Sequence, residues 1–141
     1  MSRVKKQKTL KKTSEREGEK LNFTLRTPDL EKVYSEFRKN TDPNYCPFCN
    51  RDLMRHEFKY WIVVDNRFPY NKAFVTHHLL AAKRHVRTWE ELTREEFEEL
   101  KSIEYQVMNK EFGDYDVIII NVPARQSVPR HLHFHLAAYK K

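Results

Sequence analysis

Five of the seven histidines in the sequence fall into two clusters, the adjacent pair His77 and His78 and the alternating row His131, His133 and His135. Side chains alternate across a β-strand, so the three alternating histidines would share one face while the apolar residues between them face the core. A neutral imidazole is a good nucleophile toward phosphorus near pH 7, because its ordinary pKa is about 6.5. The row could therefore attack a phosphoryl group and stabilise its charge.

The same pattern has two simpler interpretations. Three alternating histidines could hold a metal ion at the surface, or they could be the polar face of an ordinary strand. A single histidine is more often structural than catalytic, so the sequence around the row decides how it is interpreted.

Residues 131–137 read His-Leu-His-Phe-His-Leu-Ala and resemble the signature of the histidine triad (HIT) superfamily, His-φ-His-φ-His-φ-φ with φ apolar, at all seven positions. Residues 76–85, Thr-His-His-Leu-Leu-Ala-Ala-Lys-Arg-His, resemble a second stretch of that family, in which a histidine leads an apolar strand that ends in a basic pair and another histidine. The resemblance runs from about Tyr45 to Tyr139. It favours the Hint-like hydrolase branch, because relatives resembling galactose-1-phosphate uridylyltransferase carry Gln where this chain has His135.

The resemblance implies a function and a role for each residue of the site. His133 matches the nucleophile, which attacks the α-phosphorus of a nucleotide to give a nucleotidyl-histidine that water hydrolyses, while His131 and His135 contact the phosphate and the leaving group. The implied activity is that of a nucleotide phosphoramidase or nucleotidyl hydrolase acting on purine nucleotide phosphoramidates or dinucleoside polyphosphates, as a homodimer. The implied substrate-binding residues are Asn66, Asn121, Gln126 and Ser127.

The segment Cys46-Pro47-Phe48-Cys49 adds a candidate metal site. One C-x-x-C supplies two thiolates, so tetrahedral zinc needs two further ligands. By resemblance to bacterial family members these are His77 and His131, with His85 as a substitute for His77. The zinc would be structural, and no organic cofactor is implied. Two free thiols are the alternative, whereas a redox C-x-x-C lacks the βαβ context it needs.

Composition excludes several classes of protein. The 141 residues are 39% apolar, which suits one domain with a core. The two glycines, Gly18 and Gly113, are far apart, so no glycine-rich phosphate loop can be written. The longest apolar runs, such as residues 61–64, are far shorter than the roughly 20 residues that cross a bilayer. The basic N-terminus lacks the apolar segment of a signal peptide, so we expect a cytoplasmic protein with no membrane segment.

The net charge of +7 is concentrated at the N-terminus. Residues 1–20 hold eight basic residues and three glutamates, which gives +5 and leaves +2 for the remainder. Such a segment predicts a disordered basic tail over 1–20, followed by a HIT-like domain over 21–141. The tail allows one alternative function, a zinc-stabilised nucleic-acid-binding module, although binding of nucleic acid is not the expected role. A second alternative is a non-catalytic nucleotide-binding protein.

Periodicity and end signals predict the elements that position these residues. A Thr-Pro-Asp start signal indicates a short helix over 27–39, and a capping box of Thr93 and Glu96 indicates a long helix over 93–112, preceded by a helical turn from Thr88. Alternation and β-branched or aromatic residues indicate strands, which are 58–65, 76–82, 117–121 and 131–139. With few helices and short connections, this order predicts an α+β, HIT-like fold built on an antiparallel sheet.

Overall fold

A computed structural model of the chain describes residues 24–122 and 130–141. The predicted basic tail 1–20 and its boundary with the domain lie outside the described residues. The predicted substrate-binding residues Gln126 and Ser127 also lie outside them. No helix in the described ranges is long and apolar enough to cross a membrane.

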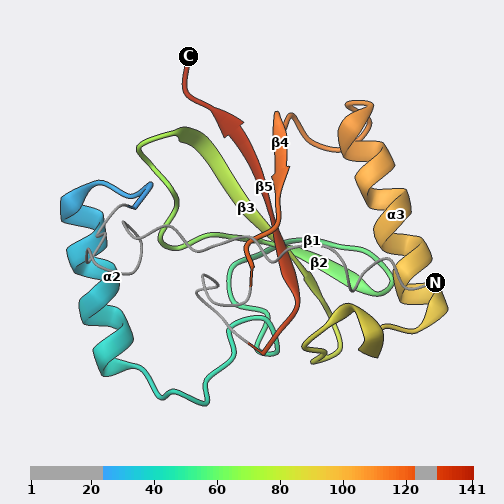
Figure 1. Ribbon diagram of the computed structural model, residues 1–141, viewed down its shortest axis with the longest axis horizontal. Coiled ribbons are helices and arrows are strands. Elements are labelled where there is room, and N and C mark those ends of the chain that lie inside the picture. The colour runs from blue at the N-terminus through green and yellow to red at the C-terminus, as the bar shows by residue number, and fades with distance from the viewer. Residues whose placement is uncertain (1–23, 123–129) are drawn as a thin grey trace, which may run out of the picture.

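The chain folds into one antiparallel sheet with a helix on either side (Figure 1). The elements in chain order are α2 (Pro28–Asn40), β1 (Met54–Glu57), β2 (Trp61–Asp65), β3 (Phe74–Ala82), the 3-10 helix η2 (Trp89–Glu91), α3 (Arg94–Met108), β4 (Val117–Ile119) and β5 (His133–Tyr139). The five strands are ordered β1-β2-β3-β5-β4, and every neighbouring pair is antiparallel. The predicted α+β fold with a long helix and a short N-terminal helix is confirmed.

The helix α3 covers one face of the sheet. Leu100, Ile103 and Val107 lie at helical spacing and pack with Trp61 of β2 and Phe134 of β5 in the main core. All five are at most 4% exposed, so this face is closed to solvent.

The opposite face of β5 carries the histidines. His133 is paired in register with Ala81 of β3, and His135 with Leu79. The two histidines are only 2% and 3% exposed. The strand therefore presents an apolar face to α3 and an imidazole face to the other side, as the alternation in the sequence predicts.

Both helices begin where the sequence predicts. Thr27 is the N-cap residue of α2, with Pro28 at its first position, and Thr93 forms a capping box with Glu96 at the start of α3. The expected helical turn after Thr88 is η2.

The long helix ends at Met108 rather than near Phe112. Lys110 adopts a left-handed backbone conformation with φ of 59°, which ends the helical path, and Gly113 follows with φ of 72°. A Cβ on Gly113 would lie 2.2 Å from the ring of Tyr115, so the turn that leads to β4 needs glycine here.

The strands differ from the predictions mainly at their ends. β2 begins at Trp61 rather than at Phe58, and β5 begins at His133 rather than at His131. The sequence analysis missed β1, since all four of its residues are exposed and show no alternation of apolar and polar side chains. This edge strand is held by pairing with β2 and not by a buried face.

The capping box of α3 allows a direct test of helix stability. Thr93 Oγ1 accepts the backbone N–H of Glu96 at 3.1 Å, and the Glu96 carboxylate accepts the backbone N–H of Thr93 at 2.8 Å. We expect Thr93→Ala to lower the free energy of unfolding by about 1 kcal/mol, measured by urea denaturation. Thr88→Ala is the matched control, because Thr88 makes no side-chain cap bond, and an equal loss in the two variants would contradict the prediction.

Candidate functional site

The imidazole of His133 is held in one tautomer by a backbone carbonyl. Its Nδ1 lies 2.8 Å from the carbonyl oxygen of His131. A carbonyl can only accept, so Nδ1 carries the proton and Nε2 keeps its lone pair. Burial lowers the pKa of His133, although the bond to His131 opposes this shift. His133 is therefore a neutral imidazole whose unprotonated nitrogen is Nε2.

A second fixed pair lies beside it, formed by His77 of β3 and His135 of β5. The backbone N–H of Tyr70 donates to His77 Nδ1 at 2.9 Å, so the proton of neutral His77 is on Nε2. That nitrogen lies 2.7 Å from His135 Nδ1, which accepts it and leaves the proton of His135 on Nε2. His135 therefore carries its N–H on Nε2, and its ring centroid lies 5.5 Å from that of His133.

Burial keeps this pair uncharged. It lowers the pKa of His77 to about 4, with smaller contributions from the charges of Arg26 and His78. It lowers the pKa of His135 to about 3, assisted by His133, His77 and Arg26. Hydrogen bonds rather than positive charge hold the two rings together.

Asn121, which follows β4, lies beside Nε2 of His135, the ring nitrogen that does not face His77. Its side-chain amide lies 2.9 Å from the Tyr70 hydroxyl and 3.1 Å from His135 Nε2. Because that nitrogen carries the proton of His135, the amide atom that faces it must be the acceptor oxygen. The ring of Tyr70 stacks on that of His135, with centroids 5.4 Å apart and planes at 20°. The structure thus brings the predicted Asn121 to the triad, and it adds Tyr70, which the sequence analysis missed because its role is made by a backbone N–H and a ring contact that no motif reveals.

Asn66 also lies close to the site, and its side-chain amide contacts both its own loop and His77. Its Oδ1 accepts the backbone N–H of Phe68 at 2.9 Å, and its Nδ2 lies 3.3 Å from His77 Nδ1. This is the turn-forming geometry of an asparagine. Its predicted contact with ribose hydroxyls stays a prediction.

Four candidate metal ligands converge at the other end of the triad. Their donor atoms lie within 4.8 Å of one another, and the residues are Cys46, Cys49, His85 and His131. His131 Nδ1 is 3.2 Å from Cys46 Sγ, 3.7 Å from Cys49 Sγ and 3.0 Å from His85 Nδ1. Ligand atoms bound to tetrahedral zinc through ordinary Zn–S and Zn–N distances lie about 3.3–3.8 Å apart, so this set suits a tetrahedral metal ion.

The ring of His131 is oriented for such a role. Its Nε2 lies 2.7 Å from the backbone oxygen of Ala82, and because that oxygen only accepts, Nε2 carries the proton. The unprotonated Nδ1 therefore faces the thiols. A ligand histidine whose other nitrogen donates to a carbonyl is the usual arrangement in metal sites.

The charges of the two thiols also suit a cation. The pKa of Cys46 is lowered to about 6, because hydrogen bonds with His131 and Cys49 outweigh the opposing effect of burial. The pKa of Cys49 is raised to about 11 by burial and by its neighbour Cys46. Without a metal the Cys46 thiolate would need a proton on His131 Nδ1, whereas a bound cation accepts lone pairs from Nδ1 and from both thiolates.

Two predicted roles change. His77 was the first choice for the fourth ligand, but both of its nitrogens are bonded elsewhere, to Tyr70 and His135, and His85 takes that place. His131 was expected to donate to phosphate oxygens, but both of its ring nitrogens face protein groups. The group of His131 that contacts the His133 ring is its backbone carbonyl.

Phe48, which lies between the two cysteines, connects the thiol cluster to the triad. Its ring is 1% exposed and lies 5.1 Å from that of His131 and 5.0 Å from that of His133, measured between centroids. The C-x-x-C loop therefore contributes an apolar wall beside His133 as well as two thiols.

Comparisons with known proteins bear on the fold and the family of this chain. Three similar solved structures are a HIT family hydrolase from Legionella pneumophila Philadelphia 1 (21% identity, 69% of this chain and 95% of that chain), a histidine triad protein from Clostridium difficile (22%, 68% and 89%) and a hypothetical histidine triad nucleotide-binding protein from Sulfolobus tokodaii strain 7 (19%, 68% and 70%), each with a TM-score of 0.50. At these identities they show the shared fold. No curated protein sequence matches the chain significantly. The family model of the HIT domain matches residues 53–141, more than half of the sequence, and the chain therefore belongs to the HIT family.

Proposed function

We propose that this protein is a nucleotide hydrolase that works through a covalent nucleotidyl-His133 intermediate. The observation that carries the proposal is the bond from His133 Nδ1 to the His131 carbonyl, which leaves the lone pair of Nε2 available for attack on phosphorus. The proposed substrates are purine nucleotide phosphoramidates or dinucleoside polyphosphates. The scissile bond is then phosphorus–nitrogen or a phosphoanhydride.

The proposed reaction has two displacements at the α-phosphorus. In the first, the bond from His133 Nε2 to phosphorus forms while the bond to the leaving group breaks, and the leaving group keeps the electron pair and takes a proton from solvent. In the second, water attacks the same phosphorus and releases a proton to solvent, the bond to Nε2 breaks, and its electron pair returns to the imidazole. The net reaction consumes one water and yields a nucleoside monophosphate and the protonated leaving group.

The geometry supports charge stabilisation in both displacements. Attack by a neutral imidazole places positive charge on the ring, and the His131 carbonyl that accepts from Nδ1 stabilises this charge. His135 presents its Nε2–H beside the nucleophile and can donate to a phosphoryl oxygen, with Asn121 next to it. The remaining predicted contacts, Gln126 and Ser127 with phosphate and Asn66 with ribose, are part of the proposal.

We propose that the bound metal is zinc and that it is structural. Cys46, Cys49, His85 and His131 supply two sulfur and two nitrogen donors, the set that tetrahedral zinc prefers. Zinc would cross-link the C-x-x-C loop to His85, which follows β3, and to His131, which precedes β5. Through the ring of His131 it would also fix the carbonyl that orients His133.

We propose further that the protein is a cytoplasmic homodimer with a basic tail over residues 1–20. Within the described part of the chain, β4 is paired only with β5 and lies at an edge of the sheet, so its other side is open to a second copy. An unpaired edge is a common place for strand pairing between subunits.

The covalent intermediate is the direct test of the mechanism. With adenosine 5′-phosphoramidate as substrate, we expect an AMP adduct on His133 in intact-mass and peptide-mapping spectra of briefly quenched samples. His133→Ala should lose the adduct and lower kcat by about 10³-fold or more, because the nucleophile is gone. His56→Ala changes an exposed histidine of β1 and serves as the control. If the wild-type chain binds nucleotides but shows neither turnover nor adduct across several of them, it is a nucleotide-binding protein and the proposal fails.

The metal site is tested by exchanging its candidate histidines. We expect about one zinc ion per chain after purification, measured by elemental analysis. His85→Ala should weaken binding at least about 100-fold, because it removes a ligand, while His77→Ala should retain the metal. Cobalt substitution should give a thiolate charge-transfer band in the wild type and in His77→Ala. Equal retention of metal in the two variants would contradict the ligand set.

A further inference from the structure

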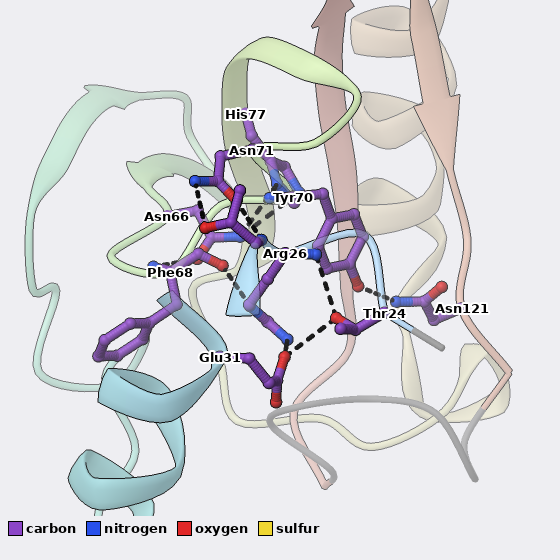
Figure 2. Close-up of polar contacts among 10 residues, drawn as sticks. Thr24, Arg26, Glu31, Asn66, Phe68, Tyr70, Asn71, His77 and Asn121 are labelled. Atoms are coloured by element: carbon purple, nitrogen blue, oxygen red, sulfur yellow. Dashed lines mark hydrogen bonds and ion pairs between the residues drawn. The ribbon is translucent and has the colours of Figure 1, made fainter. Parts of the chain in front are cut away.

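The segment Thr24–Thr27, with α2 behind it, precedes the residues matched by the family model but is bonded to a loop of the site (Figure 2). The backbone N–H of Thr27 donates to Asn71 Oδ1 at 2.8 Å, and Asn71 Nδ2 donates to Thr27 Oγ1 at 3.1 Å. The backbone N–H of Lys72 donates to the carbonyl of Leu25 at 2.8 Å. Three hydrogen bonds thus join the segment to Asn71 and Lys72 at the end of the loop of residues 66–72.

Arg26 is the centre of this contact. It is only 7% exposed, which is rare for arginine, and its Nε donates to the carbonyl of Phe68 at 2.8 Å. Its guanidinium pairs with Glu31 of α2 at 3.4 Å. It also lies 4.1 Å from the ring centroid of Tyr34 and 5.1 Å from that of Tyr70. One buried side chain therefore connects α2 to both ends of the segment 68–70.

The same segment determines the state of the histidine pair. Tyr70 donates its backbone N–H to His77, and its ring stacks on His135. Phe68 and Tyr70 are two residues apart, so a shift of the Phe68 carbonyl moves the Tyr70 N–H with it. Figure 2 shows this path, from Arg26 at the centre to Phe68 on one side and to Tyr70 and His77 on the other.

We propose that Arg26 is a positioning residue for the His77–His135 pair. It holds the loop so that the Tyr70 N–H stays on His77 Nδ1, which keeps the proton of His77 on Nε2 and directs it to His135. His135 then presents its own N–H toward the phosphoryl group. The proposal rests on the proposed function for its effect on rate, but the hydrogen bond from His77 to His135 is a property of the free protein.

A merely structural arginine would have a different effect. Loss of such a residue lowers stability and leaves the hydrogen bond between the imidazoles unchanged in the molecules that remain folded. Loss of a positioning residue loosens that bond in the folded protein and lowers kcat more than it raises KM, because the misplaced donor acts on the transition state.

The test compares Arg26→Ala with Arg38→Ala. Arg38 lies over the same Tyr34 ring, at 5.6 Å, but it is exposed and does not contact the loop. In ¹H–¹⁵N NMR spectra of the full chain we expect a protected His77 Nε2–H signal in the wild type and in Arg38→Ala. In Arg26→Ala this proton should exchange with water about tenfold faster, because the pair opens locally more often. With adenosine 5′-phosphoramidate, kcat should fall about 10-fold to 100-fold in Arg26→Ala with little change in KM.

Arg26→Lys keeps the charge but cannot donate to Phe68 and pair with Glu31 in one planar arrangement. It should fold and show the same changes to a smaller extent, which keeps the test decisive if Arg26→Ala does not fold. An unchanged His77 signal and unchanged kcat in either folded variant would overturn the proposal. If the wild type turns over no nucleotide, the proposed function fails, and the exchange rate of the His77 proton alone decides the role of Arg26.

Discussion

The bond from His133 Nδ1 to the carbonyl of His131 is the contact on which the rest of the site depends, because it decides which nitrogen of the His133 ring is unprotonated. The carbonyl is useful only if its own residue is fixed. The ring of His131 is fixed by Ala82 on one side and by the thiol cluster on the other. The backbone is fixed as well, since the N–H of Leu132 donates to the carbonyl of Val86 at 2.7 Å. The contacts of the His131 ring and the backbone bond of Leu132 therefore together hold the carbonyl that bonds to His133.

Burial explains why these imidazoles need such complete pairing. An unpaired buried polar group costs free energy of the order of a hydrogen bond or more, and a buried imidazolium costs still more. Among the described residues, no buried side-chain nitrogen or oxygen lacks a partner. The lowered pKa values of His77, His133 and His135 show the same effect, because burial is the largest cause in each. The site is thus a set of neutral groups whose protons are placed by geometry.

Local patterns in the sequence were sufficient for the helices, most strands and the two faces of β5, because periodicity and capping depend on neighbours along the chain. They could not choose between His77 and His85 as the fourth metal ligand. That choice follows from the antiparallel register, in which His133 is opposite Ala81 and His135 is opposite Leu79. Residues that precede His133 therefore face residues that follow Ala81, which places His131 near His85. Register is a tertiary property, and two histidines in one stretch of sequence look alike without it.

The contact of Arg26 with the loop of residues 66–72 could not be predicted from the sequence, because it too depends on tertiary structure. Arg26 reaches the site through a backbone carbonyl and two aromatic faces, and none of these leaves a motif in the sequence. Both ends of the row of imidazoles are nevertheless held by neighbouring groups. The thiol cluster fixes His131 at one end, and the loop held by Arg26 fixes His77 and, through it, His135 at the other.

Between these two fixed ends, no described residue forms a hydrogen bond with His133 Nε2, whereas its Nδ1 is bonded to the chain. A nucleophile that accepted a protein hydrogen bond at its reactive nitrogen would lose part of its lone-pair reactivity before substrate arrived. Binding the neighbours tightly and leaving this nitrogen without a partner among residues 24–122 and 130–141 avoids that loss. One pattern of hydrogen bonds therefore explains both the fixed rings of His131, His77 and His135 and the reactivity that the proposed mechanism requires of His133.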